Sequence, residues 1–94
     1  MYEYISCDWK HNFEEEPVTI LYEVDLDEER YATRMIEVFA DGHTNNLQDK
    51  EWKFITEEPI PSVDDINKGE FGEEFSACMI SKEEFENIWT KNIE

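Results

Sequence analysis

The chain has 94 residues, and its 25 acidic and 8 basic side chains give a formal net charge of −17. A surface this negative disfavours direct binding to nucleic-acid phosphates and to anionic membranes, because both kinds of binding need clustered lysine and arginine. Hydrophobic residues make up 39% of the chain and aromatic residues 14%, so a packed fold is still expected. The length predicts one domain over residues 1–94.

A basic protein is the partner that this charge favours, because an acidic surface attracts a cationic protein and speeds the encounter. Acidity that serves solubility alone would explain the same composition. The 13 aromatic residues, three of them tryptophan, favour a chain that also needs apolar surface at an interface.

The N-terminal stretch MYEYISCDWK has neither a basic region nor an apolar run, so no secretory signal is expected. No apolar segment approaches membrane-spanning length. Cys7 and Cys78 form no C-x-x-C or metal-ligand pattern. We therefore expect a cytoplasmic protein with two reduced thiols, and a disulfide between neighbouring strands stays open.

Alternating apolar and polar residues predict the first three strands. Ile5, Cys7 and Trp9 share one face of a strand that runs from Glu3 to Trp9. Val18, Ile20, Tyr22 and Val24 alternate in the same way in a second strand, whose β-branched residues favour a central place in the sheet. A third strand runs from Arg30 to Ala40, with Arg34, Ile36 and Val38 on one side.

Asp41-Gly42 predicts a type I′ hairpin turn, because both positions of that turn need a positive φ. A fourth strand from His43 to Gln48 should then fold back on the third. A fifth is expected from Trp52 to Thr56. A further strand could form from Phe75 to Ile80.

Two helices are expected in the second half of the chain. Ser62 is a typical N-cap for a brief helix that ends near Lys68-Gly69. Ser81 and Glu84 form a capping box for a closing helix whose apolar stripe is Phe85, Ile88 and Trp89. The predicted fold class is α+β, an antiparallel sheet of about five strands with a C-terminal helix packed on one face.

The sequence WKHNFEEEP, residues 9–17, brings a histidine close to three carboxylates. His11 with Glu14 or Glu16 could serve as the general base of a small hydrolase, which is a weaker alternative for the function. A loop histidine more often forms structural hydrogen bonds, and we expect His11 and Lys10 to fix the loop against its own carboxylates. The sequence contains no G-x-S-x-G, phosphate-binding or H-E-x-x-H motif, so the chain is expected not to be an enzyme.

No metal or cofactor is expected. The acidic residues 25–29 could attract Ca²⁺, but they lack the glycine that an EF-hand loop requires. Cys7 is interpreted as a small core residue and Trp89 as core, whereas Trp52 could be core or an anchor for a partner. The residues expected to bind a partner are Glu14, Glu15, Glu16, Glu23, Asp25, Asp27, Glu28, Glu29, Trp52, Asp64 and Asp65.

Short motifs are spread over nearly the whole chain. They are Trp9-Lys10-His11, Pro17 with the apolar run to Tyr22-Glu23, Arg30-Tyr31-x-x-Arg34, Glu37-Val38-Phe39-x-Asp41-Gly42, Pro59-Ile60-Pro61, and Ile80-Ser81-Lys82-Glu83-Glu84-Phe85 up to Trp89. This combination resembles a small bacterial domain family of unknown function, some members of which lie near polymorphic-toxin and immunity genes. The resemblance implies a stand-alone bacterial domain with an immunity role, and it carries no catalytic residues. Residues 45–53 depart from the pattern.

The leading functional hypothesis is an acidic immunity or inhibitor protein. It would bind a basic protein toxin, for which a nuclease is the expected class, and cover the toxin's nucleic-acid-binding surface with carboxylates. The alternative is a phage-derived nucleic-acid mimic that occupies the groove of a defence nuclease.

Overall fold

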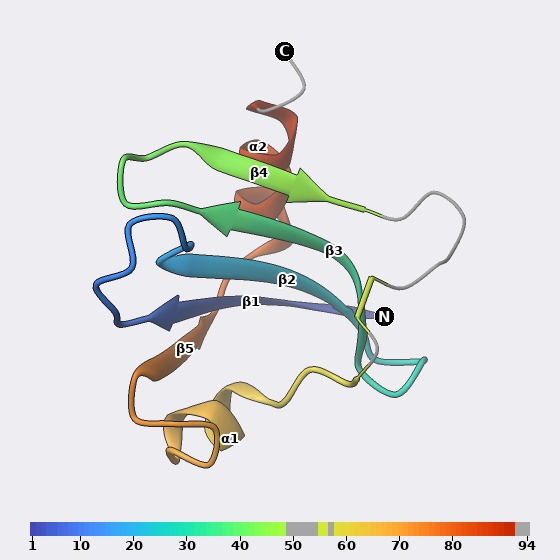
Figure 1. Ribbon diagram of the computed structural model, residues 1–94. Helices are drawn as coiled ribbons and strands as arrows, with labels where there is room; N and C mark the ends of the chain where they lie inside the picture. The colour runs from blue at the N-terminus through green and yellow to red at the C-terminus, as the bar shows by residue number, and fades with distance from the viewer. Residues whose placement is uncertain (49–54, 57, 92–94) are drawn as a thin grey trace.

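The computed structural model contains a five-stranded antiparallel sheet and two helices among the described residues, 1–48, 55–56 and 58–91 (Figure 1). The α+β fold class is therefore confirmed. In chain order the elements are β1 (Tyr2–Trp9), β2 (Thr19–Asp25), β3 (Tyr31–Val38), β4 (Thr44–Leu47), α1 (Val63–Asn67), β5 (Phe75–Met79) and α2 (Lys82–Lys91).

The strands lie in the order β4-β3-β2-β1-β5, and every neighbouring pair is antiparallel. The β-branched β2 is central, as the sequence predicts. Its register places Leu21 opposite Ser6 of β1 and Ile36 of β3, so the three side chains share one face. The predicted alternation is thus confirmed for β1 and β2 and for β3 from Arg34 to Val38, whereas a bulge at Thr33 interrupts it before Arg34.

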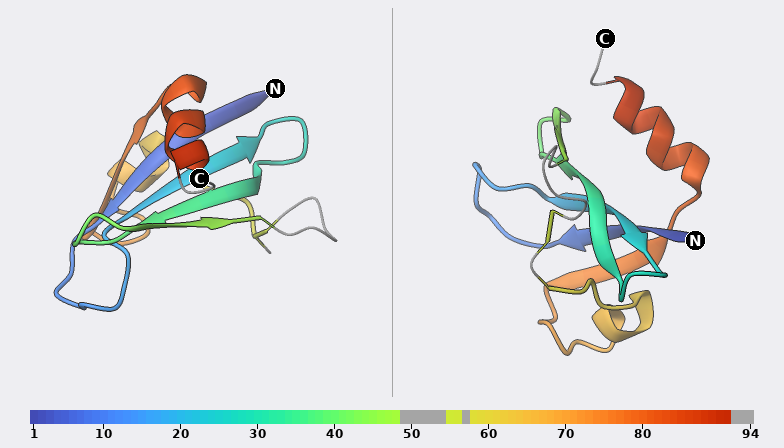
Figure 2. Two further views of the ribbon diagram at one scale, coloured as in Figure 1. Left: turned by 90° about the horizontal axis from the view of Figure 1, so that it is seen from above. Right: turned by 90° about the vertical axis from the view of Figure 1, so that its right-hand side faces the viewer.

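Helix α2 covers this face of the sheet (Figure 2, right). Ser81 caps the helix by accepting a hydrogen bond from the backbone N–H of Glu84 at 3.0 Å. Phe85 is fully buried against Tyr4, Leu21 and Ile36, and Ile80, Ile88 and Trp89 pack around this cluster. The predicted apolar stripe and the predicted docking of the C-terminal helix are both confirmed.

A second core lies on the opposite face, so the sheet is covered on both sides. It is built from Ile5, Val24, Ala32 and Ile60, all buried. Ile55 and Ile60 cover this core, and backbone hydrogen bonds hold them in place. Ile55 N–H donates to the Ala32 carbonyl of β3 at 2.9 Å, and Ile60 N–H donates to the Arg30 carbonyl in the turn before β3 at 2.8 Å. The segment that contains Ile60 leads into α1, where Ser62 accepts from the Asp65 N–H as the predicted N-cap.

The turn between β3 and β4 differs from the predicted type I′ turn. Gly42 has a φ of 93°, but Asp41 is not among the residues with a positive φ. Phe39 N–H donates to the His43 carbonyl and Gly42 N–H to the Phe39 carbonyl, which encloses a three-residue loop. A loop of this length needs the left-handed conformation at one position only, and glycine takes it.

The fifth strand of the sheet is β5, which corresponds to the further strand that could form from Phe75 to Ile80. It pairs with β1 from Phe75 opposite Trp9 to Met79 opposite Ile5. The strand predicted from Trp52 to Thr56 is not observed in its described part, Ile55 and Thr56, and residues 52–54 lie outside the described residues. No described helix is long and apolar enough to cross a membrane.

Candidate functional site: an acidic aromatic groove

The loop between β1 and β2 is fixed by backbone hydrogen bonds at its base. Trp9 N–H donates to the Val18 carbonyl, and Lys10 N–H donates to the Glu74 carbonyl, each at 2.8 Å. The second bond ties the loop to the segment that precedes β5. Because both ends are anchored, the tip of the loop can present its side chains in a defined arrangement.

The His11 side chain holds the loop together by hydrogen bonds to backbone groups of other loop residues. The Phe13 N–H donates to Nδ1 at 2.9 Å, so Nδ1 is unprotonated and Nε2 carries the proton that is donated to the Pro17 carbonyl at 2.7 Å. The expectation that His11 fixes the loop against its carboxylates is therefore wrong about the partners, which are backbone groups. Both ring nitrogens are occupied, so this geometry gives no support to a hydrolase that uses His11 as a base.

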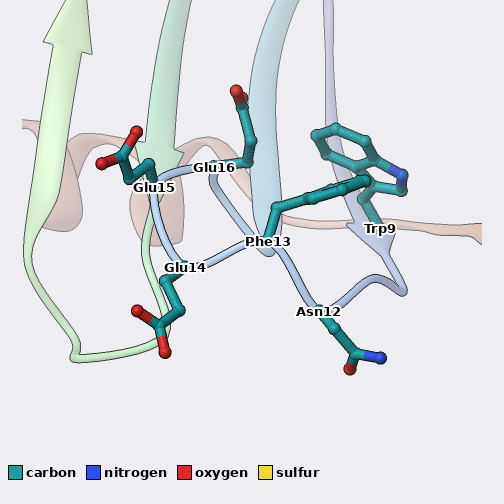
Figure 3. A pocket seen from close by; sticks show the side chains of 6 residues that line it. All are labelled: Trp9, Asn12, Phe13, Glu14, Glu15 and Glu16. Carbon is teal, nitrogen blue, oxygen red and sulfur yellow. The ribbon is translucent and has the colours of Figure 1, made fainter.

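The same loop forms an open groove of about 620 Å³, which we call the acidic aromatic groove. Its lining comes from Trp9, Asn12, Phe13, Glu14, Glu15 and Glu16 (Figure 3). The rings of Trp9 and Phe13 lie next to each other, while the carboxylate of Glu14 points to the opposite side of the loop from those of Glu15 and Glu16. The side chain of Phe13 is 63% exposed, which is unusual for so large an apolar group.

Four aromatic rings form a continuous row, of which Trp9 and Phe13 line the groove. Phe75 stacks on Trp9 with ring centroids 5.9 Å apart, Trp9 lies 4.2 Å from His11, and His11 stacks on Phe13 at 5.3 Å. The ring centroids of Trp9 and Phe13 are 6.3 Å apart. This row begins on β5 and ends at the exposed tip of the loop.

Aromatic faces beside carboxylates form a chemically suitable site for an arginine or lysine side chain. The rings attract the cation through their quadrupoles, and the carboxylates accept charge-assisted hydrogen bonds from it. The loop supplies three carboxylates and two exposed or half-exposed rings within one groove. Its carboxylate acceptors and open shape thus suit a basic side chain.

A family model described as "Domain of unknown function (DUF6881)" matches residues 3–94. The chain belongs to this family. No curated protein and no solved structure is similar enough to the chain to count as a match. The match spans nearly the whole chain, as the resemblance of the sequence motifs implies.

Two acidic residues of this DUF6881 domain that were expected to bind a partner are buried. Glu23 is 8% exposed, and its carboxylate accepts hydrogen bonds from Arg34, Thr33 and Tyr4. Asp25 is 3% exposed and accepts from the backbone N–H of Asp27 through Oδ1. Both carboxylates belong to the internal structure of the sheet, so neither presents itself to a partner.

The other acidic candidates lie away from the groove. Asp27, Glu28 and Glu29 are exposed in the β2–β3 turn, at the opposite end of the strands from the β1–β2 loop (Figure 1). The N-terminal ammonium group pairs with Asp27. Asp64 and Asp65 lie in the first turn of α1, and Trp52 is outside the described residues. The predicted set is thus spread over several surfaces, and Glu14, Glu15 and Glu16 are the members that line the groove beside Trp9 and Phe13.

The two cysteines of the DUF6881 domain are free. Cys7 is buried and pairs with Ala77 across β1 and β5, whereas the neighbouring Ser6 pairs with the exposed Cys78. Successive residues of a strand point to opposite faces, so the two thiols are on opposite sides of the sheet and cannot join. The described residues contain no group of three or more His, Cys, Asp or Glu arranged to hold a metal ion.

Proposed function

We propose that this DUF6881 domain is a binding protein without catalytic activity that captures a basic protein in the acidic aromatic groove. In its specific form the proposal is an immunity or inhibitor protein that neutralises a cationic toxin, with a nuclease as the expected class. The partner would insert arginine or lysine side chains beside Trp9 and Phe13, where Glu14, Glu15 and Glu16 balance their charge.

The proposal is supported mainly by one observation: exposed aromatic rings and carboxylates of one anchored loop line the same groove. Acidic residues scattered on a surface would act on a partner only through the long-range field. In the groove, Phe13 reaches 63% exposure although a hydrogen bond to His11 holds its backbone in place. A fixed, exposed ring beside carboxylates has the composition of an interface anchor for a basic partner.

The net charge of −17 supports the same reading through association kinetics. A cationic partner would be steered towards the chain, and the association rate would fall steeply with ionic strength. A nuclease needs its basic surface to bind phosphates, so carboxylates that occupy this surface would inhibit the enzyme by competition. The motifs resemble a family of which some members lie near toxin and immunity genes, and this resemblance supports the immunity form.

The proposal is tested by capture at two salt concentrations. The immobilised protein is exposed to lysate of its source cells, and bound proteins are identified by mass spectrometry after elution with salt. We expect a basic protein that binds at 50 mM salt and is released by 500 mM. The purified partner is then assayed for nuclease activity with increasing amounts of this chain. Loss of activity at a one-to-one ratio is the expected result, whereas full activity with excess chain would overturn the inhibitor proposal.

A further inference from the structure

A small apolar pocket lies beyond Phe75 at the inner end of the aromatic row. Its volume is about 150 Å³. The walls come from β1, β2, the segment before α1, α1 itself, the loop after it, and β5; they include Cys7, Tyr22, Ile60, Ile66, Phe71 and Phe75. A dry cavity of about this size and lining can hold one benzene molecule, so it has room for one aliphatic side chain.

Phe71 forms an exposed edge of this pocket. Its side chain is 52% exposed, whereas Ile60 and Ile66 in the pocket walls are 8% and 4% exposed. Burial raises the pKa of the Cys7 thiol, so Cys7 contributes a neutral, weakly polar wall at pH 7. The pocket is therefore apolar inside and open to solvent beside an exposed ring.

An open groove of about 600 Å³ continues from the pocket and shares Ile60, Pro61 and Phe71 with it. Arg30 lines this groove, but its guanidinium donates to Glu3 at 2.9 Å and to the Ile60 carbonyl at 2.8 Å. Glu58 and Asp65 are the carboxylates in the lining, and the Asp65 carboxylate lies 3.8 Å from the Lys68 ammonium. The surroundings of the pocket thus favour positive charge in whatever lies next to it.

We infer that the 150 Å³ pocket receives one leucine-sized aliphatic side chain of the basic partner, with a basic residue of the same segment in the adjoining groove. This inference rests on the proposed function, because the same partner occupies both sites. The stacked pair Trp9 and Phe75 joins them, since Trp9 lines the acidic aromatic groove and Phe75 lines the pocket. The partner segment therefore combines basic residues with a single aliphatic anchor.

Two short capped peptides test this inference. Each carries arginines, and one has a central leucine where its twin has alanine. The leucine peptide is expected to bind at least about ten-fold more tightly, because its side chain leaves water for the pocket. Equal affinities for the two peptides would overturn the pocket inference and leave the proposed function standing. Binding of neither peptide at 50 mM salt would overturn both.

Cys7 reports on the pocket directly. In the Cys78→Ser variant, Cys7 is the remaining thiol, and its alkylation by iodoacetamide can be followed by mass spectrometry. The leucine peptide is expected to slow alkylation of Cys7 at least several-fold, and the alanine peptide to leave the rate unchanged at the same occupancy. Equal rates with both peptides would contradict a side chain in the pocket.

Two variants alter the pocket from opposite sides. Cys7→Leu fills it from within and is expected to abolish the preference for leucine, with thermal unfolding as the check that the protein is folded. Phe71→Ala removes the exposed edge and is expected to reduce the preference without loss of the fold, because that ring is 52% exposed. A preference that is unchanged in folded Phe71→Ala and in folded Cys7→Leu would place the leucine elsewhere.

Discussion

Arg34 and Glu23 form a bidentate ion pair across β3 and β2, beneath helix α2. Nε donates to Oε1 at 2.9 Å and Nη2 donates to Oε2 at 2.6 Å. The same guanidinium lies 5.0 Å from the ring centre of Phe85 and 4.8 Å from that of Trp89, and it also pairs with Glu86. One arginine thus joins the central strands to two turns of α2.

A β-bulge completes the surroundings of Glu23. The register shifts between Glu23 and Val24, so that Glu23 pairs with Arg34 while Val24 pairs with Ala32. The extra residue, Thr33, donates to Oε1 of Glu23 at 2.6 Å, and Tyr4 donates to Oε2 at 2.9 Å. Bulges redirect side chains in this manner, and here the result is a carboxylate whose oxygens are satisfied by donors on two neighbouring strands.

Substitution of Glu23 by glutamine should destabilise the fold by about 3 kcal/mol, because Arg34 then loses its buried counter-charge and an amide N–H₂ faces hydrogen-bond donors. Tyr4→Phe removes a single hydrogen bond and should cost about 1 kcal/mol. Urea unfolding measures both effects. Glu83→Gln, on an exposed position of α2, is the control and should change stability by less than about 0.5 kcal/mol. A Glu23→Gln variant as stable as this control would contradict a stabilising role for the pair.

The contribution of Glu23 should also depend on pH. Burial raises its pKa, but hydrogen bonds from Arg34, Thr33 and Tyr4 outweigh burial, and the pKa lies below its ordinary value of 4.5. A lowered pKa in the folded state means that the stabilisation is complete above pH 4.5 and is lost as the pH falls through the folded-state pKa.

The surface acids act in the opposite direction, because their mutual repulsion weakens when they are protonated. The difference in unfolding free energy between the wild type and Glu23→Gln isolates the single group. We expect this difference to be constant from pH 7 to 5 and to shrink below pH 4.5. A difference that grows on acidification would show that Glu23 has a raised pKa.

Substitutions of Gly42 test the backbone conformation of the β3–β4 turn, because a side chain added there would make no contacts. The φ of Gly42 is 93°, and an added Cβ would meet nothing within 4 Å. Gly42→Ala should therefore cost about 1 kcal/mol through conformation alone, and Gly42→Asn less, because asparagine tolerates the left-handed region. Thermal unfolding of the two variants compares them directly. Equal stability of Gly42→Ala and wild type would mean that the turn adopts another conformation.

His11 should be in its Nε2–H tautomer at neutral pH, because the Phe13 N–H occupies Nδ1. The ¹⁵N chemical shifts of the imidazole ring distinguish the two tautomers. His11→Ala removes the hydrogen bond to the Pro17 carbonyl as well, and should weaken the binding of an arginine peptide several-fold by loosening the groove. An Nδ1–H tautomer would contradict this account of the loop.

Much of the fold could be predicted because its strands obey a two-residue period. The alternation of Leu21, Ile36 and their neighbours with polar residues shows which face of each strand is buried. Helix α2 can be predicted because it has an N-cap residue, Ser81, and a stripe of apolar side chains. The segment before α1 has no such period, since prolines interrupt it and backbone bonds to Arg30 and Ala32 hold it in place. Its coverage of the second face follows from tertiary contacts that local patterns do not encode.

The candidate site could be predicted only in part for a similar reason. The loop was recognisable from its composition, but the aromatic row depends on β5, which brings Phe75 beside Trp9. Composition alone predicts Glu23 to be a surface acid, but the strand pattern contains a signal against this. Glu23 lies two residues from Leu21 in the strand and therefore on the same buried face. On the third strand, Arg34 lies two residues from Ile36 in the same way, so its guanidinium can pair with the Glu23 carboxylate.

Binding of an arginine peptide to two charge-matched variants tests the central claim most directly. The first variant replaces Glu14, Glu15 and Glu16 by glutamine, and the second replaces the exposed Glu28, Glu29 and Glu83, so that both have a net charge of −17 + 3 = −14. If the acidic aromatic groove binds basic side chains, the first variant loses at least about ten-fold in affinity at 150 mM salt and the second stays close to wild type. Equal losses in the two variants would show that only the overall charge attracts the peptide, and would contradict a binding site in the groove.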